Sequence, residues 1–483
     1  MFGTITSEMI LAILPEIALL VLIAVVFVAD LLVPEKRRSI LASITISGLA
    51  ITLLLTVLFA RPTGGEELIW GGMLRHDWLA FVSKTLFITT ALFVSFFVAT
   101  WKDIWPKGEF YVLMLTSTMG MTFLAASADI IMLFLAIETV SIPLYILAGF
   151  MVDDDRSVEA GFKYLLFGAM TTAVMLYGFS LLYGFTGETG LAEIGAAIGA
   201  GTVPAIALVG AAFLILVGFG FKVSMVPLHF WAPDVYEGSP TPITAFLSTA
   251  SKAAGFIALV RVLIAVFPSV QAEWTTIVAV AAAVTMTVGN LIALSQKNIK
   301  RLLAYSSIAH AGYALLGVAA ASVLGVTSVV YYFLAYVATN LAAFGVVMIS
   351  SQSIDSDEIA DYAGLSRRSP TLAIVLLVSF LSLAGVPPLG GFIAKVLVFA
   401  AAVQADLIWL AVVGVLNSIL GIYYYLIVLK VVYLYEGKNE DKPVPSTRWQ
   451  MGALLVSTAL IIFLGTFFSP WYDLAAKSAA GLF

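Results

Sequence analysis

Four ionisable side chains interrupt long apolar runs of this sequence, and the chemistry open to them is the binding and release of protons. Glu138 lies in LFLAIETVSIPLYILAGF, Lys222 in GFGFKVSMVPLHFW, Lys252 in FLSTASKAAGF and Lys395 in LAGVPPLGGFIAKVLVF. A charge at the centre of a bilayer costs about 2.5–3.5 kcal/mol on insertion scales, so such residues mark proton or ion pathways. The proton affinity of a buried lysine depends strongly on whether an opposite charge lies nearby.

Small and polar residues accompany two of these side chains. The four residues 248–251 (STAS) precede Lys252, and their small side chains leave room for water beside its ammonium. Ser141 and Tyr145 follow Glu138 at i+3 and i+7, so they share its helix face and could solvate its carboxylate. Both patterns are typical of a polar path inside a membrane protein.

Three further residues are candidates for the same path. His310 in LLAYSSIAHAGY has Ser306 at i−4 and Tyr313 at i+3 on its helix face, and His229 lies in a proline-containing segment. Each histidine is open to two interpretations, a proton carrier or a hydrogen-bonded core residue. Lys163 begins a helix at its cytoplasmic end, where an interfacial role is an equally simple interpretation.

The remaining charges within the spans divide into two groups. Lys84 lies near a helix end, and we expect its long side chain to reach the membrane interface. For Glu16 and Arg261 the sequence leaves an interfacial and a buried role open.

The elements that carry these residues must be membrane helices. Of the 483 residues, 61% are hydrophobic and only 11% are charged, whereas soluble chains are about 45–50% apolar and about 25% charged. Cysteine is absent, which excludes thiolate-bound iron–sulfur clusters, thiolate zinc sites and disulfides. A nucleotide-binding enzyme is also excluded, because the G-x-G at 218–220 lies inside an apolar run without a strand before it.

Hydropathy predicts an all-α polytopic membrane protein with about 14 transmembrane helices of about 20 residues each. No connection between them is long enough for an extramembrane domain. The expected helices are 9–33, 38–60, 78–100, 109–128, 129–150, 160–184, 204–230, 242–267, 274–295, 300–320, 325–350, 371–403, 406–434 and 449–470.

Two of these helices should be discontinuous. Pro227 interrupts the seventh, and Pro387-Pro388 with Gly390-Gly391 interrupts the twelfth. Broken helices five spans apart predict two inverted repeats of five helices, helices 4–8 and helices 9–13. The expected organisation is therefore residues 1–108 with three helices, 109–267 with the first repeat, 274–434 with the second repeat, and 449–483 with a last helix and tail.

The distribution of Lys and Arg predicts the orientation. The loops after even-numbered helices hold only Arg61, Arg75 and Lys477, so the loops after odd-numbered helices are expected in the cytoplasm and both termini outside. The loops after odd-numbered helices hold Lys36, Arg37, Arg38, Lys102, Lys107, Arg156, Lys297, Lys300, Arg301, Arg367, Arg368, Lys438, Lys442 and Arg448.

Several strings resemble a known family of membrane proteins. These are EFYVLMLTSTMGM, SADIIMLFLAIETVSIPLYILAGF, EAGFKYLLFGA, PLHFWAPDVYEGSPTPITAFLSTASKAAGF, NIKRLLAYSSIAHAGYALLG and GVPPLGGFIAK. Together they are similar to the antiporter-like membrane subunits of bacterial NADH:quinone oxidoreductase, respiratory complex I, and among these to subunit N. The form TPITAFLSTASK and the lysine after the Gly-Gly break favour subunit N over subunit M, which has a glutamate in place of this lysine.

The resemblance implies a proton-pumping subunit of the bacterial plasma (inner) membrane with no redox centre and no cofactor of its own. Flavin, iron–sulfur clusters and quinone are then expected in partner subunits, and the partners are other membrane-arm subunits, including the other antiporter-like ones, and lipid, with no nucleic acid. By motif, Glu138 and Lys222 resemble the family's buried ion pair, Lys252 its central proton carrier and Lys395 the terminal group of the outward path. His310 resembles a connecting member of the polar axis, and Lys163 an auxiliary lysine.

Two other classes of function remain open from the sequence. A subunit of a multisubunit sodium/proton antiporter would share the fold, but a sodium site needs clustered oxygen ligands, and the central spans offer only the Glu138 carboxylate. A passive scaffold subunit would not need four ionisable residues inside its spans.

Overall fold

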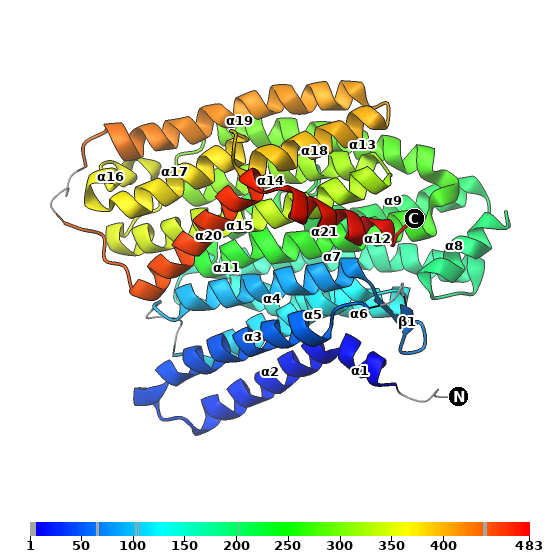
Figure 1. Ribbon diagram of the computed structural model, residues 1–483, viewed down its shortest axis with the longest axis horizontal. Coiled ribbons are helices and arrows are strands. Elements are labelled where there is room, and N and C mark those ends of the chain that lie inside the picture. Colours follow the sequence, from blue (N-terminus) through cyan, green and yellow to red (C-terminus); the bar gives the residue numbers. More distant parts are fainter. Residues whose placement is uncertain (1–5, 64–66, 102–103, 105, 202, 438–441) are drawn as a thin grey trace.

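The computed structural model describes residues 6–63, 67–101, 104, 106–201, 203–437 and 442–483, so Lys102 and Lys438 of the charge count lie outside the described residues. In this part of the chain, 13 helices are long and apolar enough to cross a membrane. Two shorter apolar helices, α17 (Pro370–Ala384) and α18 (Gly390–Gln404), together fill the place of the twelfth expected span. The predicted polytopic α-helical membrane fold is confirmed, and its helices run mostly along one direction of the molecule (Figure 1).

The N-terminal part contains three spans, as expected, and a short hairpin that the sequence did not indicate. Strands β1 (Glu67–Ile69) and β2 (Leu74–His76) pair antiparallel in the loop before the third span. The helices of this part are α1 (Ser7–Ala12), α2 (Leu14–Leu32), the 3-10 turn η1 (Glu35–Arg37), α3 (Ser39–Phe59) and α4 (Trp78–Val98).

The middle of the chain contains the first discontinuous span. The boundary between the fourth and fifth spans falls where the Asp129 carboxylate caps the next helix by accepting from the amides of Ile131 and Met132. Helix α9 then stops at Val223, because Ser224 adopts a left-handed conformation. The elements are α5 (Gly108–Ala126), α6 (Ile130–Ala148), α7 (Asp155–Thr186), α8 (Leu191–Gly199), α9 (Ala205–Val223), α10 (Trp231–Gly238), α11 (Thr241–Phe246), the π turn η2 (Leu247–Ser251) and α12 (Lys252–Val266).

The last third of the chain contains the second discontinuous span. Gly385, with a φ of 84°, ends α17, and α18 begins five residues later. The breaks therefore lie in the seventh and twelfth spans, as predicted, whereas the inverted symmetry of the repeats and the domain limits stay predictions. The elements are η3 (Pro268–Val270), α13 (Gln271–Ala293), α14 (Ile299–Ala319), α15 (Val323–Ile354), η4 (Ile359–Tyr362), α16 (Leu365–Arg368), α17, α18, α19 (Ile408–Leu434), α20 (Arg448–Thr466) and α21 (Ser469–Ala480).

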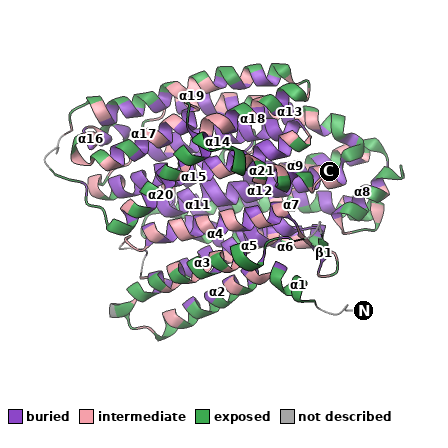
Figure 2. Ribbon diagram, viewed as in Figure 1, coloured by how far each residue is buried: buried purple, intermediate pink, exposed green. Residues whose placement is uncertain are grey.

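Burial distinguishes central from peripheral helices. The apolar windows of α14 and α15 are 94% buried, whereas that of α2 is 28% buried. The outer faces of α2, α3 and α19 are exposed, and the middle of the bundle is buried (Figure 2). Exposed apolar side chains on outer helices suit contact with lipid or with other membrane subunits.

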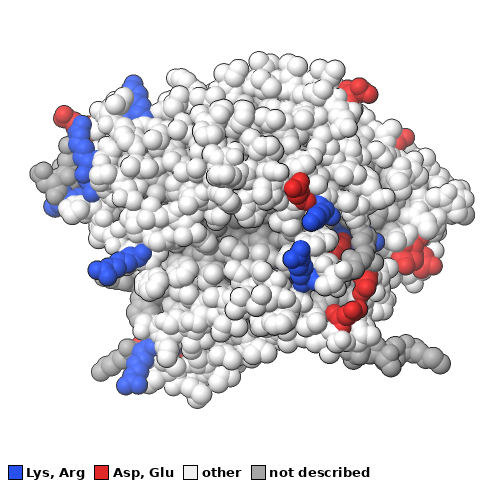
Figure 3. Space-filling view, viewed as in Figure 1, with Lys and Arg blue, Asp and Glu red and all other residues white. Residues whose placement is uncertain are grey.

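Charge separates the two ends of the bundle. On the face shown in Figure 3, basic side chains predominate at the end that carries α16 and the turn between α2 and α3, and acidic side chains predominate at the opposite end. Helix α1, at the start of the described chain, lies toward the acidic end near β1, and the C-terminus lies toward the same end near α8 (Figure 1).

Candidate proton-transfer axis

Lys252 is the first residue after a π turn. Residues Leu247–Ser251 form this turn between α11 and α12, inside one continuous membrane span. A π turn widens the helix and is frequent at functional sites. The small side chains of this stretch allow the change in helix type, and the Lys252 side chain projects from its end while remaining only 2% exposed.

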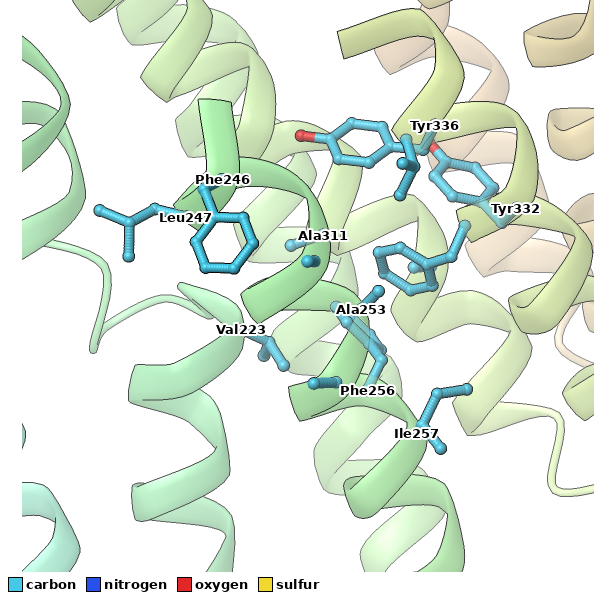
Figure 4. Packing of buried hydrophobic residues seen from close by; sticks show 14 of the residues in the cluster. Val223, Phe246, Leu247, Ala253, Phe256, Ile257, Ala311, Tyr332 and Tyr336 are labelled. Atoms are coloured by element: carbon cyan, nitrogen blue, oxygen red, sulfur yellow. The ribbon is translucent and has the colours of Figure 1, made fainter. Parts of the chain in front are cut away.

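The ammonium of Lys252 contacts α14 at a single residue. Its Nζ donates to the Ser307 carbonyl oxygen at 2.9 Å and also bonds to the Ser307 hydroxyl. The hydroxyl of Tyr336 on α15 donates to the same Ser307 Oγ at 2.8 Å, and the hydroxyl of Tyr236 on α10 lies 3.3 Å from it. Apolar residues, including Ala253, Phe256 and Ala311, pack around this part of the axis (Figure 4).

Lys222 occupies the last turn of α9, directly before the break. Its Nζ donates to the Ser141 hydroxyl of α6 at 2.8 Å. Ser141 lies one turn after Glu138, and Glu138 itself is partly exposed and makes no ion pair with Lys222 within 4.0 Å among the described residues. In this structure the hydrogen-bond partner of Lys222 on α6 is therefore Ser141 and not Glu138.

Helix α9 packs closely on the helix of Lys252. A Cβ on Gly255 would lie 3.0 Å from Cγ of Lys222, so the Lys222 stem lies tightly against α12 at this point. Gly255 is one turn after Lys252. The two lysines are thus neighbours across a helix contact, without a direct hydrogen bond between the described residues.

His310 lies on the same face of α14 as Ser306 and Tyr313, as the spacing predicts. Its Nδ1 is 2.5 Å from the Tyr332 hydroxyl, and its Nε2 is 3.3 Å from the Tyr425 hydroxyl, which also bonds to Ser306. Both ring nitrogens therefore have hydroxyl partners, an arrangement that permits proton transfer in either tautomer.

Lys395 bridges the break of the twelfth span. Its Nζ donates to the Ala384 carbonyl at the end of α17, at 3.0 Å, and lies 4.7 Å from the centre of the Tyr313 ring. The two segments approach closely because position 391 is glycine; a Cβ there would lie 1.9 Å from the Ser382 carbonyl oxygen. The break thus leaves the Ala384 carbonyl oxygen without a helical hydrogen bond among the described residues, and the Lys395 ammonium donates to it instead.

A group of amides and hydroxyls continues beyond Lys395 and was not expected from the sequence. Asn290 of α13 donates to the Tyr313 hydroxyl at 3.3 Å and to the Asn417 side-chain oxygen at 3.2 Å, and it accepts from the Tyr424 hydroxyl at 3.1 Å. Uncharged polar residues in apolar helices give a weak sequence signal, which explains why Asn290 and Asn417 were missed.

Lys163 does not reach the axis but holds the short helix α10. Its Nζ is 2.6 Å from Glu159 and 2.5 Å from Asp234 of α10. Arg301 of α14 is 2.9 Å from Asp234 and 2.7 Å from Glu237. Burial would raise the pKa of Asp234, but hydrogen bonds from Lys163 and Arg301 outweigh it and lower the pKa. We call these pairs the α10 clamp.

His229 lies in the connection between α9 and α10. It is 5% exposed, its ring lies 4.4 Å from that of Phe230, and its Nδ1 has no hydrogen-bond partner among the described residues. No hydrogen bond of the described chain joins it to the lysines of the axis.

A polar hollow of about 1080 Å³ opens at the end of the bundle that the charge count assigns to the cytoplasm. It is lined by loops that follow odd-numbered spans, including residues 237–240, at and just after the end of α10. Lys300 also lines the hollow, and its Nζ donates to the carbonyl oxygens of Glu237 and Ser239 at 2.6 and 2.9 Å. The hydroxyl of Ser239 is buried and lacks a partner among the described residues.

Four charged residues near the opposite end form two buried pairs, Lys84 with Glu16 and Arg261 with Asp77. Lys84 was expected at the interface, and this prediction is wrong: it is 6% exposed in its side chain, 2.8 Å from Glu16 and 3.0 Å from the Ala12 carbonyl oxygen. Arg261 forms two bonds to Asp77, at 2.6 and 2.8 Å. Glu16, whose role was open, lies with Lys84 where α2 packs near α4, because each charge needs a partner when water is excluded.

The predicted residues thus separate into two groups. Lys222, Lys252, His310 and Lys395 follow one another through side-chain and helix contacts across the middle of the bundle, with Glu138 at one end. Lys163 and His229 lie beside α10. Among the described residues, no cluster of three or more His, Cys, Asp or Glu side chains is arranged to hold a metal ion.

These features define an antiporter-like, multi-pass membrane protein. A family model described as NADH:quinone oxidoreductase/Mrp antiporter matches residues 127–421, which include every residue of the axis. The chain belongs to this family, and its curated relatives include proteins named NADH-quinone oxidoreductase subunit N. The protein of Moorella thermoacetica is 44% identical over 459 residues, with 94% of both chains covered, and that of Desulfitobacterium hafniense is 41% identical over 491 residues, with 97% of both chains covered.

Solved structures show the same fold. A chain of respiratory complex I from Thermus thermophilus matches with a TM-score of 0.82 and 34% identity, covering 96% of this chain and 99% of that one. A chain of the Mrp complex from Dietzia sp. matches with a TM-score of 0.88 over 99% of this chain and 98% of that one, but at 21% identity this likeness concerns the fold alone.

Proposed function

We propose that this chain is a proton-translocating, subunit N-type component of the membrane arm of a bacterial NADH:quinone oxidoreductase. The observation that carries the proposal is the series of buried lysines and a histidine, each hydrogen-bonded to a hydroxyl group or a backbone carbonyl, that crosses a bundle related to complex I subunit N. Electron transfer from NADH to quinone takes place in partner subunits, which hold flavin and iron–sulfur clusters, because this chain has no cysteine.

In this proposal the Glu138 carboxylate and Lys222 set the charge beside Lys252, which takes up a proton and passes it through His310 to Lys395. Moving one charge against a membrane potential of about 180 mV requires roughly 4 kcal/mol. A change in the separation of two charges in a low-dielectric interior supplies an energy of this size. The coupled movement of Glu138 and Lys222 relative to Ser141 is the step that we assign to this role.

The chain lies in the plasma membrane with both termini outside, in contact with lipid and with other antiporter-like membrane-arm subunits. The excess of basic residues at one end of the bundle supports this orientation (Figure 3). Glu138 is partly exposed and lies beside the exposed apolar residues Leu135 and Ile142 of the same helix, which supports a neighbouring subunit there, since a lone carboxylate against lipid is costly.

Purification of the native complex through a tag on this chain tests the proposal. We expect subunits with flavin and iron–sulfur clusters to copurify, together with NADH:quinone oxidoreductase activity. Copurification with antiporter chains alone, without flavin or iron, would instead support a subunit of a sodium/proton antiporter.

A further inference from the structure

We propose that Ser307 is the branch point through which protons reach and leave Lys252, with Tyr236 on the uptake branch and Tyr336 on the release branch. This inference rests on the proposed function, because it names how one carrier of that path exchanges its proton. It adds three hydroxyl groups to the lysines and histidine of the axis.

The contacts of Lys252 lead to this residue. Among the described residues, the Lys252 ammonium has hydrogen-bond partners only on Ser307, namely its carbonyl and its hydroxyl oxygen. That hydroxyl also meets Tyr336, which donates at 2.8 Å, and Tyr236 at 3.3 Å. All four residues are at most 4% exposed. A proton that leaves Lys252 along these bonds therefore has to pass Ser307.

The valence of a hydroxyl group makes the branch directional. A serine hydroxyl has one proton to donate and two lone pairs, and an ammonium has no lone pair. When Lys252 is protonated, Lys252 and Tyr336 occupy both lone pairs of Ser307 Oγ, so its own proton can point only to Tyr236. When Lys252 is neutral, its nitrogen accepts the Ser307 proton, and Tyr236 can donate to Ser307. The protonation state of Lys252 thus reverses the hydrogen bond between Ser307 and Tyr236.

The uptake branch leads toward the polar hollow. Tyr236 directly precedes Glu237, whose neighbours as far as Pro240 line the hollow, and the unpartnered hydroxyl of Ser239 lies in the same segment. The α10 clamp and Lys300 hold this segment in place. Tyr236 therefore stands between an aqueous opening and Ser307.

The release branch leads toward His310. Tyr336 projects from α15 toward the side of α11 and α12 (Figure 4), and its ring centre lies 5.3 Å from that of His310. His310, Tyr336 and Ser382 line a cavity of about 10 Å³, which is the size of about one water molecule. From there the His310 ring continues the path toward Lys395.

Each transfer conserves protons and leaves no charged oxygen. On uptake, Ser307 gives its proton to the Lys252 nitrogen while it receives the proton of Tyr236, which is replaced from the side of the hollow. On release, the N–H bond of Lys252 breaks as a new O–H bond forms on Ser307, which passes its former proton to Tyr336 after the Tyr336 hydroxyl has turned to accept it. The O–H bond that Tyr336 held before breaks in the same step, and that proton passes through the small cavity to His310.

The test measures protons pumped per electron in vesicles that contain the assembled complex. We expect Ser307→Ala to lower pumping about a hundredfold, the low end of what a positioned proton-transfer group contributes. Ser307→Thr keeps a hydroxyl and should restore most of the pumping. Ser328→Ala is the matched control, because Ser328 is a buried serine of α15 whose hydroxyl, in the described part of the chain, bonds only to its own helix at the Gly325 carbonyl.

Two outcomes separate this inference from the proposed function. Full pumping by Ser307→Ala, with pumping lost in Lys252→Met, contradicts the branch and leaves the function intact. Full pumping by Lys252→Met contradicts the proposed function itself. If Ser307→Ala does not assemble, Tyr236→Phe and Tyr336→Phe each remove one oxygen atom. The inference then requires that each of these two tyrosine variants pumps less than the wild type. Wild-type pumping by either tyrosine variant overturns the inference.

Discussion

Arg261 lies nine residues after Lys252 on the same helix, and we predict that it stabilises the fold without carrying protons. Its guanidinium binds both oxygens of Asp77, and its Nε donates to the Ala125 carbonyl at 2.7 Å. Asp77 also caps α4 by accepting from the Ala80 amide at 2.7 Å. The side chains are 3% and 4% exposed, so Arg261→Ala leaves a buried carboxylate uncompensated, which costs about 3–5 kcal/mol.

Thermal denaturation of the purified complex, followed by loss of this subunit from the soluble fraction, measures the effect. We expect a clearly lower midpoint for Arg261→Ala and for Asp77→Ala. Arg61→Ala is the matched control, since Arg61 is exposed near the same end of the bundle and exposed substitutions usually change stability by less than about 0.5 kcal/mol. The protons pumped per electron should be unchanged in the Arg261→Ala complexes that remain assembled. Normal stability together with lost pumping would refute the reasoning and place Arg261 in the proton path.

Two further predictions concern the ends of the path. Lys395→Arg should assemble but pump poorly, because arginine does not release its proton in proteins, and Lys395→Glu should retain more pumping than Lys395→Ala. Proton pumping is measured in vesicles that contain each assembled variant. Wild-type pumping by the arginine variant would mean that Lys395 contributes only its charge and carries no proton. Asp234→Asn should loosen the α10 clamp, whose partly exposed pairs contribute about 0.2–1 kcal/mol each, and hydrogen exchange of α10 in the complex should become faster at neutral pH. Because the pKa of Asp234 is lowered on folding, its contribution to the stability of the wild-type protein is fully present above the ordinary aspartate pKa and is lost as the pH falls through the folded value. Hydrogen exchange of α10 that is equally fast in both proteins at neutral pH would contradict the clamp.

The span count and both helix breaks could be predicted because they depend on local sequence. Runs of about 20 apolar residues can satisfy their backbone groups in a bilayer only as helices, and Pro227 and the Pro-Pro and Gly-Gly pairs remove helical hydrogen bonds wherever they stand. The face shared by His310, Ser306 and Tyr313 followed from helical periodicity in the same way.

The partners of the charged residues could not be predicted, because they come from distant parts of the chain. Lys84 looked interfacial from its place near a helix end, but the packing of α2 brings Glu16 to it. Ser307 and Tyr336 are separated from Lys252 by 55 and more residues, and nothing in the sequence near Lys252 points to them. The π turn was also missed, since its residues are compatible with an ordinary α-helix.

The most direct test of the central claim is proton pumping by complexes in which Lys252 is replaced. Lys252→Met removes the ionisable group and keeps much of the side-chain volume, and Lys252→Arg keeps the charge but holds its proton. Pumping per electron is measured in vesicles that contain equal amounts of assembled complex, with NADH oxidation recorded on the same preparation. We predict that both variants pump fewer protons per electron than the wild type. Wild-type proton yields in both variants would contradict the assignment of this chain as a proton-translocating subunit that works through its buried lysines.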